Sequence, residues 1–107
     1  MIFEIEFDER ALKEWNKLDK AIREQFKKKL KKLQGNPHIK SARLHGDLAG
    51  CYKIKLRASG FRLVYQVLDD EIVILVIAIG KRDDEQAYET ASQRRSEERR
   101  VGKECLR

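Results

Sequence analysis

The stretch that decides the fold is Cys51–Tyr65, CYKIKLRASGFRLVY. Alternation along a strand sends its apolar and its basic side chains to opposite faces. The apolar members are Tyr52, Ile54 and Leu56, and the basic members are Lys53, Lys55 and Arg57. A tight turn at Ser59-Gly60 would pair Arg57 with Arg62 on a returning strand. We therefore predict a β-hairpin with an apolar core face and four cations on the other face.

Like charges that face one another in a sheet are destabilising, so solubility alone does not explain this cationic face. A polyanion that lies across the face would explain it. The prediction depends on the hairpin register, because a three-residue loop would shift the pairing by one residue.

Length and composition point to one domain with its own core. The chain has 107 residues, of which 41% are apolar and 39% are charged, and its net charge is +6. A net charge of this sign favours nucleic acid or another acidic partner, although a solvated lysine-rich surface has the same composition.

No apolar run reaches the roughly 18 residues of a membrane span, and no secretory segment follows Met1. We therefore expect a cytoplasmic protein without membrane contact. The spacing of Cys51 and Cys105 does not suggest a metal site, and we expect free thiols.

Upstream of the hairpin, residues 2–7 alternate as a half-buried strand, and two amphipathic helices follow. Asp8 and Asp19 are their candidate N-caps, and Gly35-Asn36-Pro37 ends the second helix. The apolar positions of the two helices are Leu12, Trp15 and Leu18, then Ile22, Phe26, Leu30 and Leu33.

Downstream of the hairpin, Asp69-Asp70 makes a turn into residues 71–80, which are apolar on both faces and predict a central strand. The predicted fold is α+β, in the order β-α-α-β-β-β with a short C-terminal helix. Two antiparallel helices cover one face of a mainly antiparallel four-stranded sheet, and the other face is a partly exposed platform that carries the cations.

Residues 94–107, RRSEERRVGKECLR, change the character of the chain. They contain six basic and three acidic residues and have almost no apolar periodicity. We expect a domain at 1–93, followed by a charged extension that is either helical or vector-derived, and functional reasoning leaves the extension out.

The cationic face could support cleavage of RNA by its own 2′-hydroxyl group, which needs a base and cations near the phosphate. Arginine binds two phosphate oxygens and stays charged, and crowding by other cations loosens the proton of a lysine. Arg82, after the central strand, and Tyr88, on the next segment, are well placed to join the site. No cluster of metal ligands stands out, so we expect neither metal nor cofactor.

Other cations and both histidines receive weaker interpretations. His38 lies in a turn and His45 in a loop, which disfavours a histidine acid–base pair but leaves contact of His45 with RNA open. Lys28 and Lys32 belong to a run of lysines that is most simply the solvent-exposed face of an amphipathic helix. Contact with phosphate or ribosomal RNA is the alternative.

The segments FDERALKEWNKL, REQFKKKL, CYKIKLRASGFRLVYQV and IGKRDDEQAY resemble the RelE toxins of bacterial type II toxin–antitoxin pairs, in the RelE/ParE superfamily. The resemblance covers residues 1–93. It implies a microbial-ribonuclease-like toxin that enters the ribosomal A site and cuts mRNA there by 2′-hydroxyl attack, without metal, leaving a 2′,3′-cyclic phosphate.

The resemblance also assigns roles to residues of this chain. Lys53 and Lys55 match the catalytic lysines, Arg62 and Arg82 match the arginines that bind the scissile phosphate, and Tyr88 matches the tyrosine that stacks on the mRNA base. His45 stands where close relatives usually have an arginine, and the loop after it is longer by one residue. Arg57, His45, Lys28 and Lys32 complete the expected RNA contacts.

The implied partners are a RelB-like antitoxin that wraps the toxin, the ribosome with its A-site mRNA, and operator DNA bound through the antitoxin complex. Two other functions stay open. One is a toxin of the same fold that poisons DNA gyrase, as the related ParE family does. The other is a nucleic-acid-binding module without catalytic activity.

Overall fold

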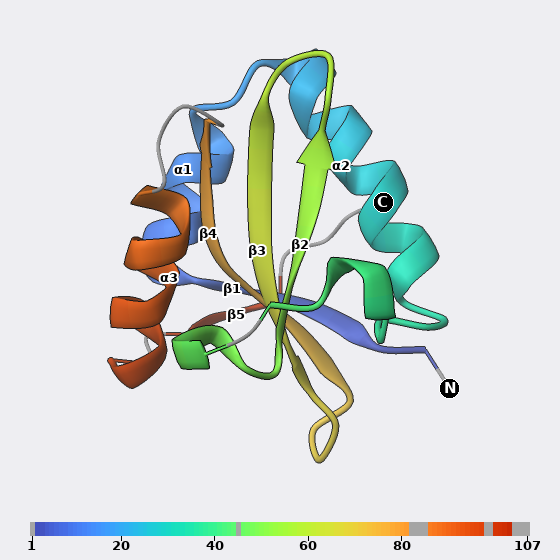
Figure 1. The fold of residues 1–107 in the computed structure, drawn as a ribbon. Helices are drawn as coiled ribbons and strands as arrows, with labels where there is room; N and C mark the ends of the chain where they lie inside the picture. The colour runs from blue at the N-terminus through green and yellow to red at the C-terminus, as the bar shows by residue number, and fades with distance from the viewer. Residues whose placement is uncertain (1, 45, 82–85, 98–99, 104–107) are drawn as a thin grey trace.

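A computed structural model describes residues 2–44, 46–81, 86–97 and 100–103 of the chain (Figure 1). Its elements in chain order are β1 (Glu4–Asp8), α1 (Glu9–Asn16), α2 (Lys20–Leu33), the 3₁₀ turns η1 (Lys40–Ala42) and η2 (Gly46–Leu48), β2 (Cys51–Leu56), β3 (Phe61–Leu68), β4 (Val73–Lys81), α3 (Gln86–Ser96) and β5 (Arg100–Lys103). The predicted β-α-α-β-β-β order and the C-terminal helix are confirmed.

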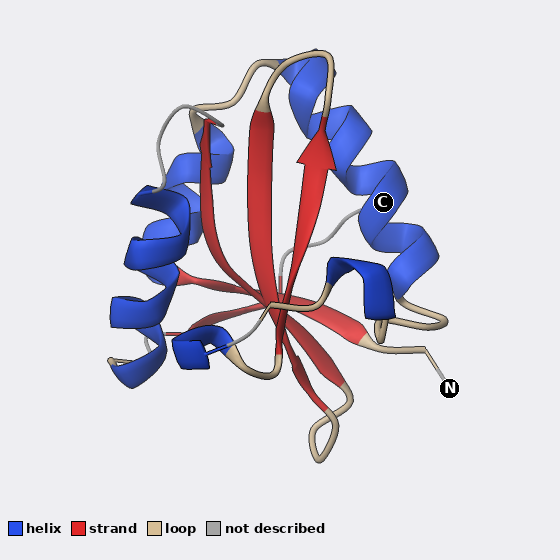
Figure 2. Cartoon of the chain, in the orientation of Figure 1, coloured by secondary structure: helices blue, strands red, loops and turns tan. Residues whose placement is uncertain are grey.

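One sheet runs through the molecule, with helices on both of its faces (Figure 2). The strand order is β2-β3-β4-β1-β5, in which β1 pairs with β4 in parallel and the other pairs are antiparallel. Every residue from Val73 to Ile79 is buried, which confirms that β4 is the central strand. Helices α1 and α2 pack on one face as predicted, whereas α3 covers part of the opposite face.

The hairpin forms with a longer turn than predicted. Lys55, and not Arg57, pairs with Arg62, so the turn contains the four residues Arg57–Gly60. Gly60 adopts a φ of +78°, and its N–H donates to the carbonyl of Leu56 at 2.8 Å. Glycine tolerates this left-handed conformation, which lets the chain close the longer turn. The predicted register was therefore wrong by two positions, but a shift of two keeps every side chain on its predicted face.

The main core lies between the sheet and the two N-terminal helices. The side chain of Asp8 accepts a hydrogen bond from the backbone of Arg10 at 2.9 Å and so caps α1, as predicted. Phe7, Trp15 and Phe26 form a chain of aromatic contacts, with ring centroids 5.2 Å and 6.4 Å apart. The predicted apolar positions of α2 and of the hairpin point into this core.

Phe26→Ala tests this core. Phe26 is fully buried at its centre, so the truncation is expected to lower the free energy of unfolding by about 3–5 kcal/mol, through lost burial and the cavity left behind. Lys29→Ala, at an exposed position of the same helix, should change it by less than about 0.5 kcal/mol. Urea unfolding measures both values, and equal losses would contradict the packing described.

His38, in the loop after α2, is hydrogen-bonded to Tyr52 near the start of the hairpin. The two ring nitrogens of His38 lie 3.0 Å from the Tyr52 hydroxyl and 2.8 Å from a carboxylate oxygen of Asp69. The hydroxyl of Tyr65, stacked on Tyr52, donates to the carbonyl of Pro37 at 3.0 Å. Burial raises the pKa of Tyr65, so it stays a neutral donor. Both ring nitrogens of His38 therefore have structural partners, and the expectation that disfavours a histidine mechanism stays a prediction.

The C-terminal segment takes part in the sheet. Helix α3 runs through the expected boundary at residues 93 and 94, and β5 pairs with β1 through Glu6 with Lys103 and Asp8 with Arg100. The strand β5 was not predicted. The division into a domain at 1–93 and an extension stays a prediction, now with regular structure on both sides of its boundary. Within the described ranges, no helix is long and apolar enough to cross a membrane.

Candidate active site

The cations of the hairpin gather on the sheet face opposite α1 and α2. Lys53 and Lys55 alternate with buried residues along β2, and Arg62 on β3 is the cross-strand partner of Lys55. A shallow hollow over this part of the hairpin is lined by Lys55, Leu56, Arg57, Gly60, Phe61 and Arg62. The structure therefore brings together the two lysines and one of the two arginines assigned to catalysis.

Arg62 has a glycine beside it on the neighbouring strand. Its cross-strand partner on β4 is Gly80, which has no side chain. Lys53 is paired with Val64, a short buried side chain. The cross-strand neighbours of these two cations, Val64 on β3 and Gly80 on β4, therefore have a small side chain or none.

The electrostatics of this face act on Lys55. The ammonium groups and guanidinium groups around it, of which Lys53 contributes most and Arg62 next, lower the pKa of Lys55. Arg57 adds a smaller effect in the same direction. Nearby positive charge disfavours the ammonium form, so a larger share of Lys55 is neutral at a given pH. A neutral lysine among fixed cations combines a proton acceptor with charge that suits a phosphate.

Three predicted site residues lie wholly or partly outside what the structure describes. Arg82 and His45 fall on undescribed residues. Tyr88 belongs to α3, but its side chain is not described. Their assigned roles stay predictions.

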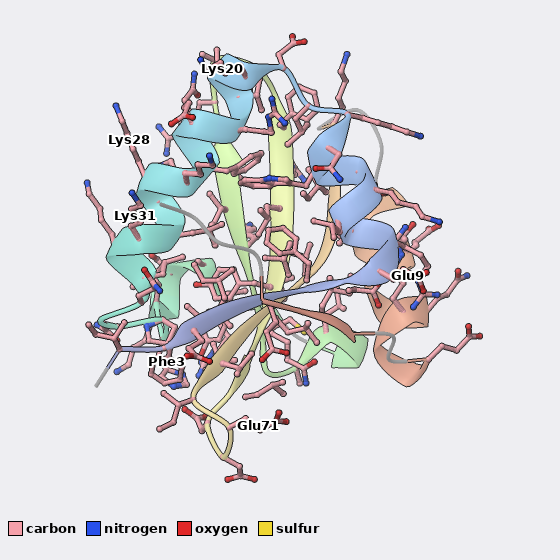
Figure 3. All side chains as sticks on the ribbon, turned by 180° about the vertical axis from the view of Figure 1, so that it is seen from behind. Phe3, Glu9, Lys20, Lys28, Lys31 and Glu71 are labelled. Atoms are coloured by element: carbon pink, nitrogen blue, oxygen red, sulfur yellow. The ribbon has the colours of Figure 1, made fainter. Side chains whose placement is uncertain are left out.

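The lysines of α2 lie apart from the hairpin cations. Lys28 and Lys32 are exposed on the helix that packs against the other face of the sheet. Seen from behind, Lys28 and Lys31 project outward from α2 (Figure 3). The contact of Lys28 and Lys32 with RNA stays a prediction.

Lys81 is a further cation of β4, but it lies on the face opposite Arg62, because its cross-strand partner Phe61 packs against the main core. It ends β4 and pairs with Phe61, and its ammonium nitrogen lies 5.6 Å from the centre of the Phe61 ring. In the ranges that the structure covers, no group of three or more His, Cys, Asp or Glu side chains could hold a metal ion.

Comparison with known proteins places this site in a family. The profile of the ParE toxins of type II toxin–antitoxin systems (parDE) matches residues 5–86. The chain is 51% identical, over 94 residues, to the mRNA interferase toxin RelE of Escherichia coli K12, which covers 88% of this chain and 98% of the relative. The chain belongs to the RelE toxin family. A putative RelE-like toxin protein of E. coli is 61% identical over the same length and coverage.

Solved RelE structures share the fold. The free state of an E. coli RelE mutant superposes with a TM-score of 0.81 at 50% identity, and covers 88% of this chain and 98% of that one. The E. coli RelBE toxin–antitoxin complex gives 0.71 at 54% identity, covering 76% and 96%. A RelE mutant bound to a peptide of the antitoxin RelB gives 0.73 at 50% identity, covering 85% and 95%.

Proposed function

We propose that this RelE-family chain is the toxin of a type II toxin–antitoxin pair and acts as a metal-independent mRNA endoribonuclease in the ribosomal A site. The observation that carries the proposal is the group of Lys53, Lys55 and Arg62 on one face of the sheet. The pKa of Lys55 is lowered there by its cationic neighbours. E. coli relatives named mRNA interferase support the same activity.

The reaction begins when Lys55, in its neutral form, takes the proton of the 2′-hydroxyl. The freed oxygen attacks the adjacent phosphorus, the P–O2′ bond forms and the P–O5′ bond breaks. Arg62 binds the phosphate oxygens, on which negative charge grows in the transition state. The departing 5′-oxygen takes a proton, for which we assign the Lys53 ammonium on the same face. The products are a 2′,3′-cyclic phosphate and a 5′-hydroxyl end.

The remaining residues extend this site. Arg82 supplies a second guanidinium to the phosphate, and Tyr88 stacks on a base to orient the nucleotide. Arg57, at the turn, is placed to hold the neighbouring phosphate, and His45 contacts the RNA from its loop. Lys28 and Lys32 serve on the far side of the molecule as contacts to ribosomal RNA.

Dependence on the ribosome follows from the form of the hollow over the hairpin. A shallow hollow does little by itself to align a 2′-hydroxyl, phosphorus and leaving oxygen, and alignment is worth many orders of magnitude in rate. The decoding site would supply this alignment by holding the mRNA in an extended path.

The partners follow from the same assignment. A RelB-like antitoxin would cover the site, and its own DNA-binding part would carry the complex to operator DNA. We place these events in the cytoplasm, where ribosomes translate. The solved RelE complexes with RelB support the antitoxin.

A modified substrate tests this chemistry. Ribosomes are programmed with a defined mRNA in which one A-site nucleotide lacks its 2′-hydroxyl. Cleavage is expected 3′ of that nucleotide in the unmodified mRNA, with an end that ligates only after removal of the cyclic phosphate, and it should be absent in the 2′-deoxy mRNA. Cleavage of the 2′-deoxy mRNA at the same position would exclude attack by the 2′-hydroxyl.

Because the matching family profile is named for ParE, gyrase poisoning is the second candidate. A supercoiling assay separates the two. We expect full gyrase activity at toxin concentrations that cut ribosome-bound mRNA completely. Inhibited supercoiling with intact mRNA would favour the second candidate.

Lys53→Ala is expected to move the pH dependence of cleavage. Removing the largest cause of the lowered pKa of Lys55 raises that pKa, so less neutral base is present at neutral pH. The rising limb of the single-turnover rate against pH should move to higher pH, and the rate at pH 7 should fall. Lys13→Ala, an exposed lysine of α1, is the control and should keep the wild-type limb. An unmoved limb in Lys53→Ala would contradict the role of Lys55 as base.

A further inference from the structure

The C-terminal half of β4, residues 77–81, has an edge with no neighbouring strand among the described residues. Among the described residues, β1 pairs with β4 only as far as Val76, and β4 continues to Lys81. A bulge at Ile77 interrupts its pairing with β3, so that Ile77 and Ala78 both face the side of α3. The edge beyond the bulge presents backbone groups that need partners, because buried N–H and C=O groups are costly when left unpaired.

Two side chains take the place of the missing strand. Glu14 of α1 accepts the N–H of Ile79 at 3.2 Å, and Arg94 of α3 donates to the carbonyl of Ile77 at 2.9 Å. The two side chains also bind each other. The guanidinium nitrogens of Arg94 lie 2.8 Å and 3.3 Å from the two carboxylate oxygens of Glu14. One forked ion pair therefore ties α1, β4 and α3 together.

This ion pair is sheltered and well formed. The side chain of Arg94 is 11% exposed and that of Glu14 is 33% exposed. A two-pronged guanidinium–carboxylate pair is stronger and more directional than an exposed single contact. The guanidinium of Arg94 also donates to a backbone carbonyl besides the carboxylate.

The part of the apolar contact of α3 that the structure describes is small. Among the side chains of α3 that the structure describes, Ala91 is the one that is fully buried, and a methyl group contributes little by burial. Ala91 lies in the same cluster as Val64, the cross-strand partner of Lys53, so α3 borders the cationic face. Figure 1 shows α3 alongside β4. Arg94 and Glu14 add a polar attachment of α3 to the sheet beside this packing.

We infer that Glu14 and Arg94 are positioning residues for the nuclease site, which hold α3, the helix that carries Tyr88 in its sequence, against the sheet. The inference rests on the proposed function, in which Tyr88 of α3 orients the substrate. Tyr88 lies one helical turn before Ala91 and less than two turns before Arg94. Loss of the ion pair should leave the hairpin cations in place and loosen the helix that carries Tyr88.

Hydrogen exchange of the free protein tests whether the Glu14–Arg94 ion pair holds α3 in place. In Arg94→Gln and in Glu14→Gln, backbone amides of α3 should exchange roughly tenfold faster or more, while those of β3 keep the wild-type rate. Arg94→Lys keeps the charge without the fork and should fall between. The matched control is Glu24→Gln, which breaks the exposed 3.6 Å pair with Lys27 on α2 and should leave α3 unchanged. Unchanged exchange in α3 would overturn the inference.

A double-mutant cycle tests the functional part on programmed ribosomes. Arg94→Gln should slow single-turnover cleavage about tenfold in the wild-type background and have little effect in the Tyr88→Ala background, because the pair acts through that residue. General destabilisation would instead slow both backgrounds equally, and that result would overturn the inference. If wild-type toxin cuts ribosome-bound mRNA and Arg94→Gln cuts it at the same rate, the inference is overturned while the proposed function stands. If wild-type protein does not cut ribosome-bound mRNA, the proposed function fails, and with it the positioning role.

Discussion

Lys55→Ala is expected to lower the single-turnover rate of mRNA cleavage on programmed ribosomes by about 10²–10⁴-fold, the usual contribution of a general base. Lys55 is exposed on β2 and outside the core, so the variant should stay folded. Its pKa is lowered by the cations around it, which suits it to accept a proton. Rapid-quench primer extension measures the rate. Lys17→Ala, an exposed lysine at the end of α1, should keep the wild-type rate.

Lys55→Arg separates the role of base from that of fixed charge. Arginine keeps the positive charge but does not give up its proton at usable pH. The variant should therefore remain slower than wild type by about 10²-fold or more. A rate within tenfold of wild type for Lys55→Arg would show that Lys55 acts only through its charge.

Arg62→Ala is expected to lower the same rate by about 10²–10³-fold, the cost of removing one preorganised donor from a developing oxyanion. Arg62 is the cross-strand partner of Lys55, opposite Gly80, so its loss removes charge next to the scissile phosphate. The maximal rate should fall by a larger factor than the factor by which the half-saturating toxin concentration rises. The reason is that the contact is strongest in the transition state.

Two further variants calibrate the result at Arg62. Arg43→Ala removes an exposed arginine from the segment before the hairpin and should have little effect. Arg62→Lys keeps the charge without the two-pronged geometry and should recover part of the rate. An unchanged maximal rate in Arg62→Ala would mean that Arg62 does not stabilise the transition state.

Strand alternation made the cationic face predictable from the sequence alone. Lys53 and Lys55 must share a face because they lie two residues apart on one strand. The turn length was less certain, and the left-handed Gly60 set the register two positions away from the prediction. Arg62 still joined the lysines, because its face depends on whether the shift is even and not on its size.

Features that depend on distant parts of the chain were not predictable in this way. The ion pair of Glu14 with Arg94 joins residues 80 positions apart, and neither position stands out in its own helix. The bulge at Ile77 lies inside a run that is apolar on both faces, so no polar residue marks it. Strand β5 is four residues long and contains a glycine, and its pairing partner lies at the other end of the chain.

The most direct test of the central claim is primer extension on a defined mRNA, incubated with the toxin in the presence and absence of programmed ribosomes, beside Lys55→Ala. Nuclease activity that depends on the ribosome predicts cuts within the A-site codon, with ribosomes only and with wild-type toxin only. Equal cutting of naked and ribosome-bound mRNA would contradict the dependence on the ribosome. Intact mRNA with folded wild-type toxin would contradict the nuclease itself.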